Sequence, residues 1–262
     1  MLAFSQHPTP SSSSLPSPHQ PLNQHRLYQR TLLSAEEVAT FHLDNFWTFV
    51  GVDIAPNASL ETGLVMIDNE LTITRMDKLY TNAAIQQTLT QIAGQANVMV
   101  VLDMPKNLSV PGRFRQEELK YHGLRLHEAG YDRQAMSRFN RRARQFYTQL
   151  EEQGLFPVLG FASKLKMNLG FTSAFKARSP QGCRNLQSFV SDVLQLKNMP
   201  INLIPSSVLD AMVLAYAGWV LSHGDYGVDA MLYHDAEGYR VLDVKHLLEL
   251  EFSPVRPDWV PC

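Results

Sequence analysis

The chain has 262 residues, of which 45% are hydrophobic and 18% are charged, and its formal net charge is −2. This is the composition of an ordinary globular protein with ample chain for a core, and the overall charge does not indicate a nucleic-acid or membrane partner. Two cysteines, Cys183 and Cys262, are too few for a disulfide framework or a thiolate metal site, which suits a reducing compartment. The apolar runs are far shorter than the roughly 20 residues of a membrane-spanning helix. We therefore expect a soluble, cytoplasmic protein without a membrane partner.

Residues 1–33 are predicted to be a disordered tail, because they are rich in Pro, Ser, Gln and His and poor in apolar residues. No apolar segment of a secretory signal follows the first residue. Organellar transit peptides are also Ser-rich and acid-poor, but the many prolines and the scarcity of arginine favour a plain tail. A single domain is expected over 34–250, followed by a C-terminal tail over 251–262.

The ordered part alternates between predicted strands and helices. Apolar runs bounded by turn residues predict five strands, over 46–53, 62–68, 71–76, 97–107 and 155–161. Only the turn residues "DNE" separate the second strand from the third, so these two are expected to pair as a hairpin. The fourth is almost wholly apolar, which is typical of a central parallel strand. Near the C-terminus, 230–244 predicts two short strands around the turn "DAEG".

Helical spacing of apolar residues predicts helices over 82–95, about 134–153, 179–196 and 205–223. The strands and helices together indicate an α/β domain with a mixed sheet. Cap and stop signals are expected at Asn82, Gly94, Gly154, Ser179 and either Ser206 or Ser207.

Two of the predicted strands end in an aspartate that is soon followed by a proline. Asp53 ends the first strand and Asp103 ends the apolar part of the fourth. In open α/β sheets, function gathers at the carboxyl ends of adjacent strands, so these carboxylates are expected to face one crevice if the first and fourth strands are neighbours. Asp210, near the start of an apolar helix, must find water, a hydrogen bond or a cation. Turn chemistry for the first two, and the helix dipole for the third, are the alternative interpretations.

Three converging carboxylates repel one another unless a cation lies between them. Oxygen ligands without clustered Cys or His favour magnesium or manganese (Mg²⁺ or Mn²⁺) over zinc. Two such ions about 4 Å apart activate water and stabilise the leaving oxygen in phosphodiester cleavage. Asp53, Asp103 and Asp210 are therefore the predicted catalytic metal ligands of a divalent-metal-dependent nuclease.

Residues 111–147 carry nine Lys or Arg against four acids, a local net charge of +5, and we expect a basic helical insertion over about 111–153. Such a segment can follow a phosphate backbone, with Tyr121, Phe139, Phe146 and Tyr147 available for stacking on bases. A solvated amphipathic helix explains the same residues equally well. The candidate nucleic-acid contacts are Arg113, Arg115, Arg138, Arg141 and Arg142.

The order of these motifs resembles the ribonuclease H-like fold of the resolvase and integrase superfamily. More closely, over about 46–244, it resembles a family of unknown function described as predicted ribonuclease H-like nucleases. The resemblance implies a mixed five-stranded sheet flanked by helices, a divalent metal and a nucleic-acid substrate. It also makes Lys176 a candidate catalytic residue that neutralises a phosphate, although an ordinary solvated lysine is the alternative. The matching residues are Gly51-Val52-Asp53, Asp103-Met104-Pro105, Phe175-Lys176, Gly182, Arg184, Asp210-Ala211 and Glu237-Gly238-Tyr239.

One position departs from the pattern of that family. After the basic segment the family has a strand with a glutamate, whereas this chain reads "FPVLGFASKL", with Gly160 or a neighbour in the place of the acid. A site with fewer carboxylates binds metal more weakly, so a catalytically impaired domain that binds nucleic acid or a protein partner is the alternative. An ATP-handling, sugar-kinase-like domain is less favoured, because "DIAPN" lacks the glycines of a phosphate-binding turn. The sequence leaves open whether the substrate is DNA or RNA, and what the oligomeric state is.

Overall fold

The structure is a computed structural model, which describes residues 46–55, 60–95, 97–104, 126–127, 130–131, 133–223, 232–234 and 240–242. The predicted tails over 1–33 and 251–262 lie outside the described residues. The same holds for Arg113, Arg115 and Tyr121 of the predicted basic insertion.

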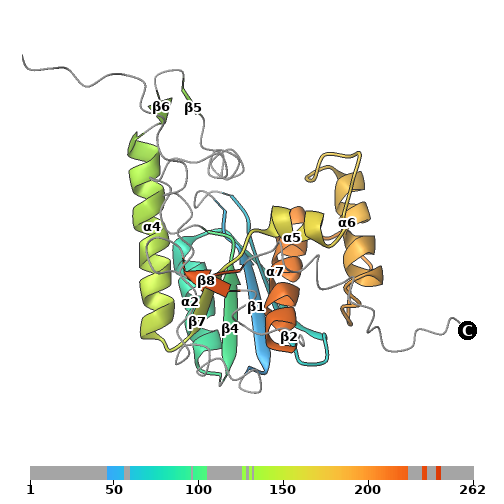
Figure 1. The fold of residues 1–262 in the computed structure, drawn as a ribbon, viewed down its shortest axis with the longest axis horizontal. Coiled ribbons are helices and arrows are strands. Elements are labelled where there is room, and N and C mark those ends of the chain that lie inside the picture. Colours follow the sequence, from blue (N-terminus) through green and yellow to red (C-terminus); the bar gives the residue numbers. More distant parts are fainter. Residues whose placement is uncertain are drawn as a thin grey trace, which may run out of the picture.

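A seven-stranded mixed sheet organises the fold, in the order β3-β2-β1-β4-β7-β9-β8 (Figure 1). β1, β2 and β3 form an antiparallel meander, while β1, β4 and β7 run parallel to one another. The five-stranded mixed sheet expected from the sequence is thus confirmed, and the predicted C-terminal hairpin extends it by β8 and β9. A separate two-stranded pair is formed by β5 (Leu126–His127) and β6 (Gly130–Tyr131). The strands of the main sheet are β1 (Thr48–Asp53), β2 (Thr62–Asp68), β3 (Ile73–Leu79), β4 (Val98–Leu102), β7 (Phe156–Leu159), β8 (Leu232–His234) and β9 (Arg240–Leu242).

The turn between β2 and β3 is longer than the sequence indicated, so β3 begins at Ile73 and not at residue 71. The Asp68 carboxylate accepts hydrogen bonds from the backbone N–H groups of Glu70 and Thr72, at 2.9 and 2.8 Å. Leu71 has a φ of +60°, which belongs to a turn and not to a strand. Asp68 therefore organises this turn through its side chain.

Five helices flank the main sheet in the described part of the chain. They are α2 (Asn82–Ala93), α4 (Arg133–Glu152), α5 (Ala162–Asn168), α6 (Pro180–Asp192) and α7 (Ser206–His223). All except the short α5 were expected from the sequence.

The caps of these helices were predicted with mixed success. Ser179 caps α6 as expected, since its hydroxyl accepts from the Gly182 N–H at 3.1 Å. The prediction of Asn82 as a cap was wrong: Thr81 caps α2, because its hydroxyl lies one residue earlier, where it reaches the Ala84 N–H. α7 begins at Ser206 itself, so neither Ser206 nor Ser207 precedes the helix as a cap.

The sheet separates two apolar cores. Alternate residues of β1 face opposite sides, as the period of two in a strand requires. Val50 and Val52 belong to the core under α2 and α4, whereas Phe49 belongs to the core under α5, α6 and α7 (Figure 1). Gly51 and Asp53 therefore share the face of β1 that meets α7.

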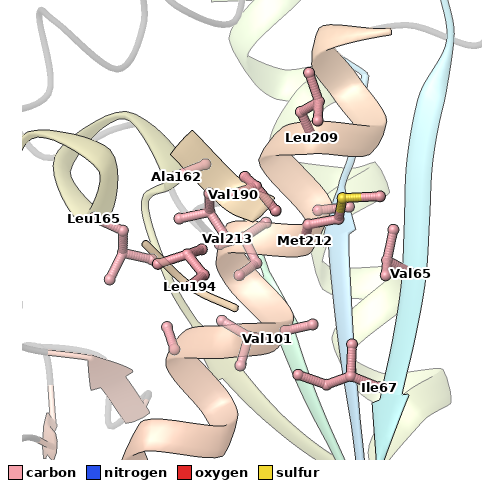
Figure 2. Packing of buried hydrophobic residues seen from close by; sticks show 14 of the residues in the cluster. Val65, Ile67, Val101, Ala162, Leu165, Val190, Leu194, Leu209, Met212 and Val213 are labelled. Atoms are coloured by element: carbon pink, nitrogen blue, oxygen red, sulfur yellow. The ribbon is translucent and has the colours of Figure 1, made fainter. Parts of the chain in front are cut away.

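α7 lies unusually close to β1 and β2 because two glycines leave room for its backbone. A Cβ atom on Gly51 would lie 1.9 Å from the Ala211 carbonyl oxygen, and a Cβ atom on Gly63 would lie 2.1 Å from the Ser207 carbonyl oxygen. Figure 2 shows Met212 on the side of α7 that faces Val65 of β2. This close approach brings the first turns of α7 to the carboxyl end of β1.

Candidate active site

A cavity of about 310 Å³ opens at the carboxyl end of β1, and we call it the β1 cavity. Its polar lining comes from β1, the residue before β2, α5, the segment before α6, α6 itself and α7. The lining side chains with polar or charged groups are Asp53, Glu61, Lys166, Arg178, Cys183, Ser206, Ser207 and Asp210.

Asp53 is the last residue of β1 and is buried on the face that meets α7. Its pKa is raised well above the ordinary value, firstly by burial and then by the carboxylates of Asp210 and Asp103. Lys166 and Arg178 act in the opposite direction. Asp53 is thus close enough to Asp103 and to Asp210 for both carboxylates to act on it electrostatically.

Asp210 lies in the second turn of α7 and is buried, with 4% of its surface exposed. One of its carboxylate oxygens accepts a hydrogen bond from the Lys166 ammonium group at 2.5 Å. Lys166 comes from the last turn of α5 and is itself only 8% exposed. The two side chains form a buried ion pair, in which each charge compensates the desolvation of the other.

Asp103 follows β4 directly, and its backbone N–H donates to the Val52 carbonyl of the neighbouring strand at 2.9 Å. Its carboxylate accepts from the Ala162 N–H at 3.0 Å. Ala162 is the first residue of α5, and Phe161, which precedes it, has no polar side chain to cap the helix. Asp103 therefore stabilises the start of α5 from a distant strand, and it does not line the β1 cavity.

Glu61 is held in place by two hydroxyl groups. One carboxylate oxygen accepts from Ser207 at 2.5 Å and the other from Tyr80 at 3.1 Å. The bond to Glu61 also raises the pKa of Tyr80. The sequence offered only a weak signal for Glu61, an acid immediately before a strand.

The donor chemistry of the cavity fits Mg²⁺ or Mn²⁺, because Asp53, Asp210 and Glu61 offer carboxylate oxygens. Burial raises the pKa of the Cys183 thiol, which donates to the Ala177 carbonyl at 3.4 Å, so it is not a thiolate ligand. Among the residues that the structure describes, no three His, Cys, Asp or Glu side chains are grouped closely enough to hold one metal ion. Within the described part of the chain, the Lys166 ammonium group is a cation in direct contact with Asp210.

The lysine at the carboxylates is Lys166, which the sequence did not single out. Lys176 is exposed and does not line the cavity, although its neighbours Ala177 and Arg178 do. The Lys176 backbone helps to begin α6, since its carbonyl accepts from the Ser179 N–H and hydroxyl.

The predicted basic surface is only partly exposed where α4 is described. Arg138 and Arg141 are exposed, whereas Arg142 is partly buried and its guanidinium donates to the Ala55 carbonyl and, at 2.9 Å, to Asn82. Arg142 therefore ties α4 to the end of β1. The interpretation of Phe146 and Tyr147 as stacking residues was wrong: both are fully buried in the core, because their side of α4 packs on the sheet.

Gly160 is buried, and the core around it leaves no room for an acid. A Cβ atom there would lie 2.6 Å from a Val101 methyl carbon and 3.1 Å from one of Leu214. Both of these distances are tighter than ordinary contacts. Apolar packing thus surrounds Gly160, which is one of the positions where the sequence resemblance implied an acid.

No family model matches the chain, and no curated protein matches it. Among solved structures, the chain is similar to Thermus thermophilus RuvC in complex with a Holliday junction substrate, with 12% identity and a TM-score of 0.41. That match covers 68% of this chain and 96% of the other. A second structure of Thermus thermophilus RuvC matches with 12% identity and a TM-score of 0.38, covering 68% and 97% of the two chains. Likenesses of this degree say nothing of what this chain does.

Within the described part of the chain, no helix combines the length and apolar character needed to cross a membrane.

Proposed function

We propose that this chain is a divalent-metal-dependent nuclease that hydrolyses phosphodiester bonds in the β1 cavity. The observation that carries the proposal is the meeting of two buried carboxylates, Asp53 and Asp210, in one open cavity. Acidic residues are almost never fully buried unless they are paired, and a perturbed carboxyl beside specific charges in a cleft marks a candidate functional site. Asp53 is buried, and its pKa is perturbed by neighbouring charges in a cavity.

Asp53, Asp210 and Glu61 are the carboxylates of the cavity that would hold magnesium or manganese, and they would have to move closer together to share one ion. Such an ion, when bound, polarises a phosphoryl oxygen and lowers the pKa of a bound water towards neutrality. Ser207 and Tyr80 each donate a hydrogen bond to one oxygen of Glu61, so a metal ion would compete with these two bonds for this carboxylate. Asp103 positions α5, and with it Lys166, at the edge of the cavity.

The substrate class that fits this cavity is a nucleic acid. Arg178 lines the cavity and is exposed, so its guanidinium can contact a backbone phosphate with two parallel hydrogen bonds. Lys176, two residues earlier, is exposed and can add a second positive charge. DNA and RNA share this phosphate chemistry, and the test below separates them.

A second candidate function is binding of nucleic acid without cleavage. Two observations favour it: Lys166 already compensates Asp210, and the core fills the place of an acid at Gly160. In this alternative the carboxylates contribute to the shape of the site and not to chemistry.

The test is a cleavage assay on labelled single-stranded, duplex and branched DNA and RNA, with Mg²⁺ or Mn²⁺ and with chelator. We expect metal-dependent cleavage that Asp53→Asn abolishes. The matched control is Asp192→Asn, which makes the same change at an exposed residue at the end of α6 and should leave cleavage intact. Binding without cleavage in either metal would favour the second candidate, and absence of both binding and cleavage would reject the two together.

A further inference from the structure

Lys166 and Asp210 form a buried ion pair in the wall of the β1 cavity. Their charged atoms are 2.5 Å apart, and their side chains are 10% and 6% exposed. Both residues line the β1 cavity together with Asp53. The pair is therefore shielded from bulk solvent but open to a small ligand that enters the cavity.

The position of Lys166 is built by tertiary contacts. α5 is anchored at its start by the Asp103 carboxylate, and Ala162 and Leu165 are buried in the core beneath α7. The Lys166 carbonyl accepts from the Phe171 N–H at 2.8 Å, which fixes the end of the helix as well. These contacts hold the backbone of Lys166 in place, so that its ammonium group reaches the Asp210 carboxylate.

The Lys166 ammonium group already occupies the Asp210 carboxylate in the wall of the cavity. Asp53 lines the same cavity, where the carboxylates of Asp210 and Asp103 and the Lys166 ammonium group all act on it electrostatically. A divalent ion that bound Asp210 would lie next to the Lys166 ammonium group, which is already bound to that carboxylate. Two positive charges on one carboxylate repel each other strongly in a site shielded from solvent.

We propose that Lys166 is the resident cation of this site: it neutralises Asp210 when no divalent ion is bound, and it competes with a divalent ion for that carboxylate. The inference rests on the proposed function, because it takes the β1 cavity to be the metal site. It adds that the Lys166 side chain lowers the affinity of the site for divalent metal. The metal therefore binds only at a concentration high enough to displace the ammonium group.

The test measures Mn²⁺ binding to the full chain, from the electron paramagnetic resonance signal of free Mn²⁺, with no substrate present. Lys166→Met keeps the length and apolar stem of the side chain but removes its charge. We expect its Mn²⁺ dissociation constant to fall about tenfold or more, which corresponds to about 1.4 kcal/mol. Lys197→Met is the matched control, because it removes the same charge at an exposed loop lysine, where solvent and salt screen the effect.

Lys166→Met leaves a buried carboxylate without its cation, so this variant can unfold in the absence of metal. The double variant Lys166→Met with Asp210→Asn removes both charges and keeps the experiment informative. It should fold without metal and bind Mn²⁺ more weakly than Lys166→Met. In thermal unfolding, Mn²⁺ should raise the melting temperature of Lys166→Met by more than that of the parent or the double variant. A merely structural ion pair would leave Mn²⁺ affinity unchanged.

The outcomes separate this inference from the proposed function. Tighter Mn²⁺ binding by Lys166→Met, without cleavage by any variant, supports the resident cation and rejects the nuclease. Metal-dependent cleavage by the parent, with equal Mn²⁺ affinity in the parent and Lys166→Met, rejects the resident cation and supports the nuclease. No Mn²⁺ binding by either protein rejects both.

Discussion

Replacing Gly51 with alanine tests whether the close approach of α7 to β1 holds the candidate site together. The new Cβ atom would lie 1.9 Å from the Ala211 carbonyl oxygen and 2.5 Å from the Ala215 nitrogen. Ordinary contact begins at 3.4 Å, so the α7 backbone would have to withdraw by about 1.5 Å. The obstacle is backbone on a buried helix and not the flexible end of a side chain, so local rearrangement cannot relieve it.

The expected cost is large for a single methyl group. Overpacking a well-packed core costs about 1–3 kcal/mol, and the upper end applies here because a buried helix must separate from the sheet. A gap of 0.5–1 Å already forfeits about a quarter to a half of each dispersion contact across it. We therefore expect Gly51→Ala to lose about 3 kcal/mol of unfolding free energy or more. For a domain of this size, this loss lowers the melting temperature by about 6–12 °C.

Urea denaturation followed by circular dichroism measures this loss, and Gly94→Ala is the control. Gly94 ends α2 with a φ of −69°, and the nearest atom to its added Cβ would be 3.6 Å away. Alanine fits there and should leave stability unchanged or raise it by about 0.4–1 kcal/mol. A Gly51→Ala protein within about 0.5 kcal/mol of the parent, the range of ordinary surface changes, would refute the close packing of α7 on β1.

Two further predictions concern pH and the tie between α4 and β1. Because burial and neighbouring carboxylates raise the pKa of Asp53 in the folded state, its ionisation costs stability as pH rises from near 4, the value of a free aspartate, through the folded-state pKa. Metal-free Asp53→Asn should therefore be more stable than the parent at neutral pH, with an advantage that shrinks towards pH 4, as urea denaturation at several pH values will measure. Arg142→Met should lose about 1–3 kcal/mol, because the Ala55 carbonyl and the Asn82 side chain each lose a donor in a partly buried place.

The same measurements can contradict both predictions. An Asp53→Asn advantage that is constant from pH 4 to neutrality would mean that this carboxyl titrates normally. For Arg142, the control is Arg141→Met, which changes an exposed neighbour on the same helix and should stay within about 0.5 kcal/mol of the parent. Equal stability of the two arginine variants would show that Arg142 does not tie α4 to β1.

The elements of the sheet and most helices were predictable from the sequence, because their periods are local. A strand that alternates between two buried faces and a helix with apolar residues on one side reveal themselves within about ten residues. β2 matches its expected bounds over 62–68, and α7 differs from the expected helix by one residue at its start. Strand ends carrying Asp53 and Asp103 were visible for the same reason.

α5 was missed, because little in its own residues specifies it. It has only seven residues, too few for a helix that is stable by itself, and the residue at its cap position is Phe161. Its first N–H is bound by Asp103, which lies 59 residues earlier in the chain. A helix that depends on a partner so distant in sequence leaves no local pattern to find.

The sequence by itself determined that aspartates stand at the ends of two strands, and that Asp53 lies on the same side of β1 as Gly51. The pairing of β1 with β4, which makes those strands adjacent, belongs to the tertiary structure. Only the tertiary structure decided which cation meets these carboxylates: Lys166, 44 residues from Asp210, in place of the lysine favoured from a motif. The physical reason is that charge pairing depends on distance in space, and that distance is set by how closely α7 packs on Gly51 and Gly63. Local periodicity carries no information about such long-range packing.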